Sequence, residues 1–421
     1  MPSGARRVAR TDAGEVRAGT YRLRWIAILS ALLPLSFSLV GCGKAPDAGI
    51  SAANSQPAAA DTFDDRFAAS QPGDRLPGGR KGFAQRQSIE PSGKRAETSE
   101  PAPYRVASLA PTIAYQRPTS EDQTTLVSLK SSAFPYLGNN PRTDEPFLNV
   151  SKGDRRGHRG LGGRVYWQDE TYNDNRVLMH VPENFDVRKP GVIVVFFHGN
   201  GATLERDVRD RQLVPQQISD SGVNAVLLAP QLAVDAADSS AGKFWQPGGL
   251  RRFVAESAGH LATLSGDPRA AKAFAKMPVI IVGYSGGFLP AAWSLDVGGL
   301  GDRIRGVFLL DAVYGELDKF ASWIEKDRTG FFVSVYTRST KRHEDELKQM
   351  LAEKGIAISD DIDGPLRPGS VIFVETPEGV THRDYVTQAW TENPVKQLLL
   401  KMAAAPALTR VATRSALPAN R

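Results

Sequence analysis

The stretch VIIVGYSGGFLPAAW, residues 279–293, places a serine among glycines at the junction of two apolar runs. The first run, VIIV, is short and β-branched, which indicates a buried strand, whereas the run after the glycines is typical of a helix. Residues 283–287, GYSGG, fit the pattern G-x-S-x-G, in which glycines allow a sharp turn that leaves the serine hydroxyl exposed. The stretch therefore predicts that Ser285 is a nucleophile. The alternative is a glycine-rich turn whose serine only caps a helix.

Strand and helix signals alternate from about residue 164 to residue 402. Buried strands are indicated by short apolar runs at 192–197, 225–229, 279–282, 307–310, 331–336 and 371–374. Helix-length amphipathic segments lie at 203–220, 249–264, 287–296, 316–326, 343–354 and 383–401. Two further runs, 165–167 and 177–181, suggest an opening antiparallel pair. Continuous apolar strands separated by helices predict an α/β fold, with a mostly parallel central sheet and helices on both faces.

The loop after the first long strand, residues 198–201, reads HGNG. Reactive groups in a parallel sheet collect at the carboxyl ends of the strands. A serine that attacks a carbonyl needs two N–H groups to hold the oxyanion that forms. We expect Asn200 to supply one of them, with Gly201 as the alternative, and Gly286 to supply the other. His198 is expected to be structural, and the whole loop has a plain glycine turn as its alternative interpretation.

Two histidines follow Ser285 and are candidates for its general base. His343 lies in the charged segment TRSTKRHEDELK, which is typical of an exposed helix start. His382 lies in VETPEGVTHRDYV, a loop between the last strand and the last helix. A histidine in a loop that follows a parallel strand can reach the serine, so His382 is the predicted base.

The order of serine, acid and histidine, with the GYSGG and HGNG motifs, resembles the α/β-hydrolase superfamily over about residues 164–402. The resemblance implies a fold and a catalytic triad but no particular substrate. The superfamily usually places the acid after the strand that corresponds to FFVSVY, yet residues 337–340 are TRST, without a carboxylate. The preceding strand ends at Asp311, the position used by pancreatic-type lipases of the same superfamily. Asp311 is therefore the predicted acid, and Glu344 is the second candidate.

The resemblance implies hydrolysis of a carboxylic ester or an amide. The reaction would proceed by two-step acyl transfer, with an acyl-enzyme on Ser285 as the intermediate. We expect no metal and no cofactor, because the sequence has no H-E-x-x-H, paired C-x-x-C or phosphate-loop motif. Two alternatives stay open. An acyltransferase would use the same triad with an acceptor other than water, and a binding lipoprotein would keep the fold without the chemistry.

Residues 1–41 have the pattern of a signal peptide. Six arginines precede an uncharged apolar run at 26–40, which is short for a permanent membrane span. The run ends in LVGC, residues 39–42, and Cys42 is the only cysteine of the chain. This resembles the lipobox of bacterial lipoproteins, which implies cleavage before Cys42 and lipidation of its thiol. The alternatives are a secreted protein with a stray cysteine and a cytosolic protein with a buried thiol.

Lipidation would place the protein in the bacterial cell envelope. Gly43 follows the cysteine, which among Gram-negative lipoproteins resembles outer-membrane sorting, so we expect an anchor in the outer membrane and a domain that faces the periplasm. Removal of residues 1–41 lowers the net charge from +6 to +2, since 46 basic and 44 acidic side chains remain. So small a charge gives no support to a nucleic-acid partner, and we expect none. The oligomeric state is not indicated.

The amino-acid composition predicts a tether, a catalytic domain and a tail after the signal peptide. Residues 42–160 are rich in Ala, Pro, Ser and Gly and predict a low-complexity tether that is partly disordered. Whether residues 131–160 pack on the domain is left open by their scattered apolar side chains. The catalytic domain is predicted at 161–403 and a disordered tail at 404–421.

Two segments bear on the substrate. Residues 311–330 have room for one helix and for no helical cap of the kind that buries long acyl chains in many lipases. The loop 231–249 carries Asp235, Asp238 and Trp245, a polar and aromatic set that could line a cleft, with an ordinary surface loop as the alternative. We expect a small water-soluble ester or an ester of an envelope polymer, with short acyl groups, as substrate.

We predict that Cys42 is the first residue of the mature protein and carries lipid. Mass spectrometry of the N-terminal peptide from cells should find a diacylglyceryl-modified Cys42, and Cys42→Ser should abolish the modification because the thiol is the acceptor. An unmodified peptide that begins elsewhere would contradict the prediction.

Overall fold

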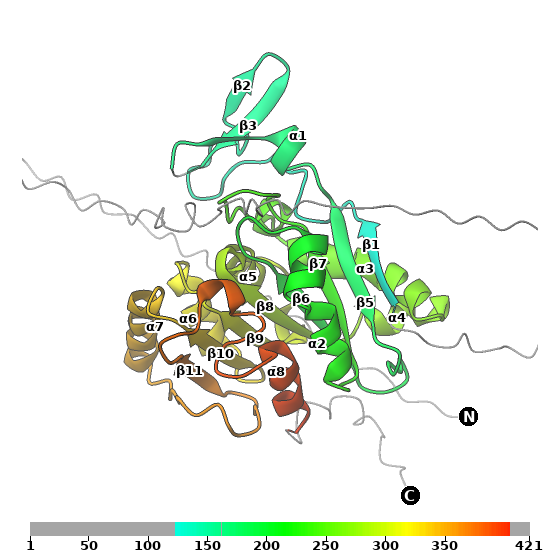
Figure 1. The fold of residues 1–421 in the computed structure, drawn as a ribbon, viewed down its shortest axis with the longest axis vertical. Helices are drawn as coiled ribbons and strands as arrows, with labels where there is room; N and C mark the ends of the chain where they lie inside the picture. Colours follow the sequence, from blue (N-terminus) through cyan, green and yellow to red (C-terminus); the bar gives the residue numbers. More distant parts are fainter. Residues whose placement is uncertain (1–122, 161, 405–421) are drawn as a thin grey trace, which may run out of the picture. The chain divides into compact units, whose positions relative to one another are not determined.

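The computed structural model describes residues 123–160 and 162–404. At its centre is an eight-stranded sheet with the order β1-β5-β7-β6-β8-β9-β10-β11 (Figure 1). Its strands are β1 Gln123–Ser128, β5 Arg176–Val181, β6 Val192–Phe197, β7 Ala225–Pro230, β8 Val279–Tyr284, β9 Ile304–Leu310, β10 Phe331–Tyr336 and β11 Val371–Glu375. Within this sheet β5 is antiparallel to the other seven strands, which all run in the same direction. The predicted fold class, α/β with a mostly parallel central sheet, is confirmed.

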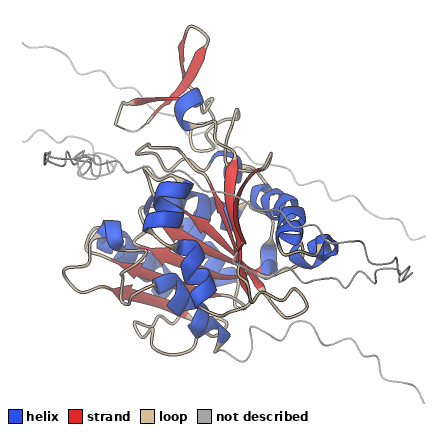
Figure 2. Cartoon of the chain, turned by 45° about the vertical axis from the view of Figure 1, so that its right-hand side comes forward, coloured by secondary structure: helices blue, strands red, loops and turns tan. Residues whose placement is uncertain are grey.

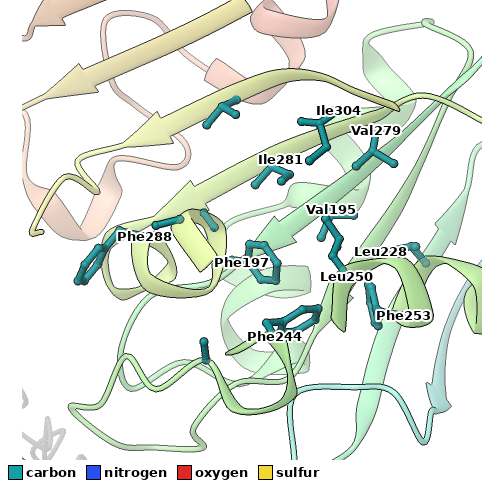
Figure 3. Packing of buried hydrophobic residues seen from close by; sticks show 14 of the residues in the cluster. Val195, Phe197, Leu228, Phe244, Leu250, Phe253, Val279, Ile281, Phe288 and Ile304 are labelled. Carbon is teal, nitrogen blue, oxygen red and sulfur yellow. The ribbon is translucent and has the colours of Figure 1, made fainter. Parts of the chain in front are cut away.

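The strand β6 shows how both faces of the sheet are covered. Every residue of its sequence VIVVFF is buried, because successive side chains enter opposite cores. The second, fourth and sixth residues belong to the core that also contains side chains of α3 Gly249–Leu264, α5 Phe288–Asp296, α6 Leu317–Lys326 and α7 Lys341–Glu353. Figure 3 shows Val195 and Phe197 of this core together with Leu250, Phe253 and Phe288. The other three pack with α2 Val214–Asp220 and α8 Pro394–Ala403. Helices therefore flank the strands on both sides, as Figure 2 shows.

Two of the predicted helices are interrupted. The segment 383–401 is α-helical only from Pro394. The residue that precedes a proline is disfavoured in the helical region, and Asn393 has a φ of 52°. The segment 203–220 is divided at Leu213, which has φ 53°, into the π-helix η2 Leu204–Arg211 and α2. Short helical turns complete the list: α1 Gln168–Thr171, η3 Gly242–Trp245, η4 Pro268–Ala270, α4 Ala271–Phe274, η5 Ser285–Gly287, η6 Gly301–Arg303 and η7 His382–Asp384.

The residues before the predicted catalytic domain are also folded. β1 is an edge strand that pairs with β5 along its whole length. A separate three-stranded sheet contains β2 Val150–Lys152, β3 Arg155–Arg159 and β4 Val165–Trp167 and projects at the top of Figure 1. The predicted pair of 165–167 with 177–181 is wrong, because β4 pairs with β3 while β5 lies between β1 and β7.

Aromatic side chains fix this early segment to the domain. Phe134 and Phe147 are fully buried, and their rings lie 5.1 and 5.0 Å from that of Tyr172. Phe147 also contacts Trp245 at 5.6 Å, so it reaches the loop that follows β7. Packed structure thus begins by residue 123, earlier than the predicted boundary at 161, because a few aromatic residues compensate for the low apolar content.

The remaining predictions on chain organisation concern residues outside those that the structure describes. These are the signal peptide at 1–41, the lipidation site Cys42, the tether up to residue 122 and the tail from residue 405. In the described part, every helix is too short or too polar to cross a bilayer.

Candidate active site

Ser285 stands at the turn between β8 and α5, as the sequence pattern predicts. Its backbone has φ 50°, an uncommon left-handed conformation for a residue with a side chain. Close packing maintains the turn, since a Cβ on Gly287 would lie 2.2 Å from the carbonyl oxygen of Phe197, and one on Gly199 would lie 2.9 Å from the Ser285 Cβ. Ser285 retains 8% of its exposure, so its hydroxyl is presented at the carboxyl edge of the sheet.

His382 and Asp311 complete a hydrogen-bonded relay with this serine. The His382 Nε2 atom lies 2.8 Å from Ser285 Oγ, and Nδ1 lies 2.6 Å from Asp311 Oδ2. A carboxylate only accepts, so Nδ1–H donates to Asp311 and leaves Nε2 to accept from the serine hydroxyl. His382 follows β11 and Asp311 follows β9, so three strand ends bring together residues that are far apart in sequence.

Asp311 is fully buried and well supplied with donors. The Thr337 N–H and the Thr340 hydroxyl donate to Oδ1 at 2.9 and 2.8 Å, and the Thr337 hydroxyl donates within 3.0 Å. Burial alone raises the pKa of Asp311, but the bonds from His382, Thr337 and Thr340 outweigh it, so the pKa is lowered overall. The carboxyl group is therefore ionised and able to stabilise an imidazolium.

Glu344, the second candidate acid, lies in a different environment. It is fully buried on α7 and accepts one hydrogen bond, from the Ser334 hydroxyl at 2.7 Å. Burial raises its pKa well above the usual value for glutamate, which favours the neutral form of the carboxyl group. Glu344 thus bonds to Ser334 and not to the imidazole. His343 lies in the first turn of the same helix, and the ring that bonds Ser285 is that of His382.

The loop that follows β6 faces the serine turn. A Cβ on Gly286 would lie 2.1 Å from Asn200 Oδ1, so the two predicted oxyanion residues are in direct contact and only glycine fits there. Gly286 lies in the first turn of η5, where amides lack intrahelical acceptors. The Gly201 N–H, the alternative donor, instead donates to the carbonyl of Ala236 at 2.8 Å. This leaves the N–H groups of Asn200 and Gly286 as the candidate oxyanion donors.

His198 fixes the shape of this loop. Its Nδ1–H donates to the Gly199 carbonyl at 2.8 Å, and its Nε2 accepts from the Leu232 N–H at 2.9 Å. Complete burial lowers the pKa of His198 to about 4, so the ring stays neutral. These bonds agree with the structural role expected for His198.

The sequence interpretation missed Tyr284, the variable residue of the serine motif. Its ring stacks on the imidazole of His382 with centroids 5.2 Å apart, and its hydroxyl donates to the His382 carbonyl at 2.8 Å. Thr337 and Thr340, the donors to Asp311, were missed as well. The serine motif fixes the position of Tyr284 in the sequence but says nothing of its contacts. The threonines could have been found, because hydroxyls that follow a strand, as in TRST, can donate to an acid at the end of the neighbouring strand.

In the polar loop 231–249, the three residues considered for the substrate cleft make contacts within the domain. Asp235 pairs with Arg206 at 2.9 Å, and Asp238 accepts from the Tyr172 hydroxyl at 2.6 Å. Trp245 is only 7% exposed, within the aromatic cluster of the early segment. Each of the three serves a structural contact, and whether they also line a substrate cleft stays a prediction. Ser239 of the same loop does reach the site and donates to Asn200 Oδ1 at 3.1 Å.

The described residues contain no group of three or more His, Cys, Asp or Glu side chains arranged to hold a metal ion. An ionised acid, an imidazole and a hydroxyl that are hydrogen-bonded in sequence are suited to nucleophilic attack on a carbonyl carbon.

Comparison with known proteins gives no match among protein-family models or curated sequences. Among solved structures, the chain is similar to a feruloyl esterase module from Clostridium thermocellum complexed with sinapinate, with 14% identity, 64% of this chain and 94% of that chain covered, and a TM-score of 0.35. An S-formylglutathione hydrolase from Agrobacterium tumefaciens gives 13% identity, 60% and 95% coverage and a TM-score of 0.34. Thermogutta terrifontis esterase 2 gives 12% identity, with 56% of this chain and 89% of that chain covered and a TM-score of 0.34.

We predict opposite results for the two buried acids. Asp311→Asn should lower kcat by about 10³–10⁴-fold, because an amide cannot hold the imidazole in the required tautomer. Glu344→Gln should leave the rate nearly unchanged, since it replaces one neutral group by another of similar size. Steady-state kinetics on a soluble ester, with circular dichroism to verify folding, measures both. Near-normal activity in Asp311→Asn together with a loss in Glu344→Gln would identify Glu344 as the acid.

Proposed function

We propose that the protein is a serine hydrolase that cleaves carboxylic esters, or amides, through an acyl-enzyme on Ser285. The observation that carries the proposal is the relay of 2.8 Å and 2.6 Å hydrogen bonds from Ser285 through His382 to Asp311. The ionised state favoured for Asp311 adds support, because a buried anion beside Nδ1 stabilises the imidazolium that forms when the serine is deprotonated.

The reaction has two half-steps. Ser285 Oγ attacks the substrate carbonyl carbon while its proton passes to His382 Nε2, and the carbonyl oxygen becomes an oxyanion near the N–H groups of Asn200 and Gly286. The bond to the leaving group then breaks, and the leaving oxygen or nitrogen takes the proton from His382. In the second half, water gives a proton to His382 and attacks the acyl carbon. The bond from Ser285 Oγ to the acyl carbon then breaks, Oγ takes the proton back from His382, and the acid is released.

A fluorophosphonate probe tests this function directly. Wild-type protein should be labelled at Ser285 and should hydrolyse a p-nitrophenyl ester, whereas Ser285→Ala and His382→Ala should lose both properties and stay folded, because triad members act as a unit. Ser265→Ala, which alters a serine at the end of α3, is the matched control and should behave as wild type. A wild-type protein that takes no label and turns over no ester would favour the non-catalytic binding lipoprotein.

We propose that the substrate carries a short acyl group and belongs to a small ester or an envelope polymer. Among the described residues, a single helix, α6, connects β9 to β10 beyond the triad acid. That connection offers no helical cap to enclose a long chain. The proposed cellular setting is the periplasmic side of the outer membrane, with lipidated Cys42 as the anchor.

The acyl-length preference is a separate prediction. The ratio kcat/KM should be higher for p-nitrophenyl acetate and butyrate than for the palmitate, because an uncapped site has little apolar surface with which to bind a long chain. Product analysis with added alcohols distinguishes hydrolysis from acyl transfer to those acceptors. Activity that rises through palmitate, or that jumps at a lipid interface, would contradict the short-chain proposal.

A further inference from the structure

The π-helix η2, Leu204–Arg211, follows the oxyanion loop and gathers charged side chains around one carboxylate. Asp207 is 7% exposed, and its Oδ2 accepts from the Thr203 N–H at 2.8 Å and from Arg206 Nε at 2.9 Å. Its Oδ1 accepts from Arg211 Nε at 3.0 Å. π-Helices are rare and are frequently found at functional sites. Here the helix places two arginines on opposite oxygens of the same group.

Each arginine that bonds Asp207 also bonds one of two loops beside Ser285, the oxyanion loop after β6 or the loop that carries His382. Arg206 Nη2 donates to the carbonyl of Gly201 at 2.6 Å, in the loop that contains Asn200. Arg211 Nη1 donates to the carbonyl of Arg383 at 2.9 Å, the residue after the catalytic histidine. The path from one catalytic loop to the other therefore runs through two guanidinium groups and a single carboxylate.

We propose that Asp207 is a positioning residue that holds the oxyanion loop and the histidine loop at a fixed separation. Guanidinium groups are planar, with donors in a fixed geometry, so an arginine bound to a carboxylate through Nε presents its terminal nitrogens in a defined direction. Displacement of a catalytic group by about 1 Å can cost about 10²-fold in rate. The inference rests on the proposed hydrolase function only for its effect on rate, since the contacts themselves do not depend on it.

The charge of Asp207 supports this role. Burial raises the pKa of its carboxyl group, but the bonds from the Thr203 N–H, Arg206 and Arg211 outweigh burial and leave the pKa lowered. The acid is thus ionised and bonds both arginines as an anion. The histidine loop has other anchors too, the Tyr284 hydroxyl on His382 and the Gln217 amide on Val386, so loss of Asp207 should displace the loop rather than unfold it.

The same helix supplies a matched control. Arg209 and Asp210 form an ion pair at 2.6 Å, with side-chain exposures of 44% and 58%. Asp210→Asn therefore makes the same chemical change three residues from Asp207, with no link to either catalytic loop. Exposed pairs of this kind contribute little to stability.

Asp207→Asn should lower kcat by about 10–100-fold and leave KM within about twofold, because substrate still binds while the catalytic groups are misplaced. Hydrogen exchange should accelerate in both loops, at 199–203 and at 381–385. Arg206→Ala should accelerate exchange only in the first segment and Arg211→Ala only in the second, and Asp210→Asn should match wild type in every measurement.

Loop-specific exchange separates positioning from a general loss of stability, which would accelerate exchange throughout the domain. Exchange can be measured even if the wild-type protein hydrolyses no ester, so failure of the proposed function and failure of this inference are distinguishable. If Asp207→Asn does not fold, the two arginine variants still test each arm of the contact. Unchanged exchange in both segments for the arginine variants, or unchanged kcat in folded Asp207→Asn, would overturn the proposal.

Discussion

The geometry of the site depends on three glycines, at positions where a side chain would meet a neighbouring residue. Cβ atoms on Gly199, Gly286 and Gly287 would meet Ser285, Asn200 and Phe197 within 2.9 Å. Each contact joins the end of β6 to the end of β8, which are neighbours in the sheet. The nucleophile and the oxyanion loop are therefore positioned by the same packing, and neither can shift alone. The left-handed backbone of Ser285 stores roughly 1–3 kcal/mol of strain, which the buried strand behind it sustains.

Two buried carboxyl groups, Asp311 and Glu344, show how hydrogen bonds influence protonation. Asp311 and Glu344 are both fully buried, and burial raises the pKa of each. Asp311 accepts from a backbone N–H, threonine hydroxyls and the imidazole, which are sufficient to keep the charge in place. Glu344 accepts from one hydroxyl and stays neutral. The number of donors, rather than depth, separates the ionised acid from the neutral one.

The strands of the sheet and the order of the catalytic residues were readable because both depend on local patterns. Apolar runs buried on both faces are distinct in the sequence, and Ser285, Asp311 and His382 follow such runs directly or after a short loop. Contacts distant in sequence were not readable. Phe134 and Phe147 stand in a polar segment, and their partners Tyr172 and Trp245 carry no local sign of the pairing. The three-stranded sheet and the early start of the domain were missed for this reason.

The predicted helix at 383–401 failed for a reason that concerns the chemistry. His382 follows β11, yet it must reach Asp311 after β9 and Ser285 after β8. Strands lie about 4.8 Å apart, so the histidine loop crosses roughly 10–15 Å of the sheet edge, past the end of β10. Residues 376–381 make this crossing, and residues 385–393 then lead from the site to α8, which begins at Pro394.

The position of the acid adds to that requirement. Thr337, directly after β10, donates to Asp311, which follows β9 and so lies one strand further from β11. With the acid one strand further from β11, the histidine loop must extend further from its own strand. Contacts from outside the triad then hold it: Tyr284 from β8, Gln217 from α2 and Arg211 from η2 bond its backbone in turn. The acid that follows β9 is thus accompanied by a threonine after β10 that bonds it and by a histidine loop whose backbone is bonded by its neighbours.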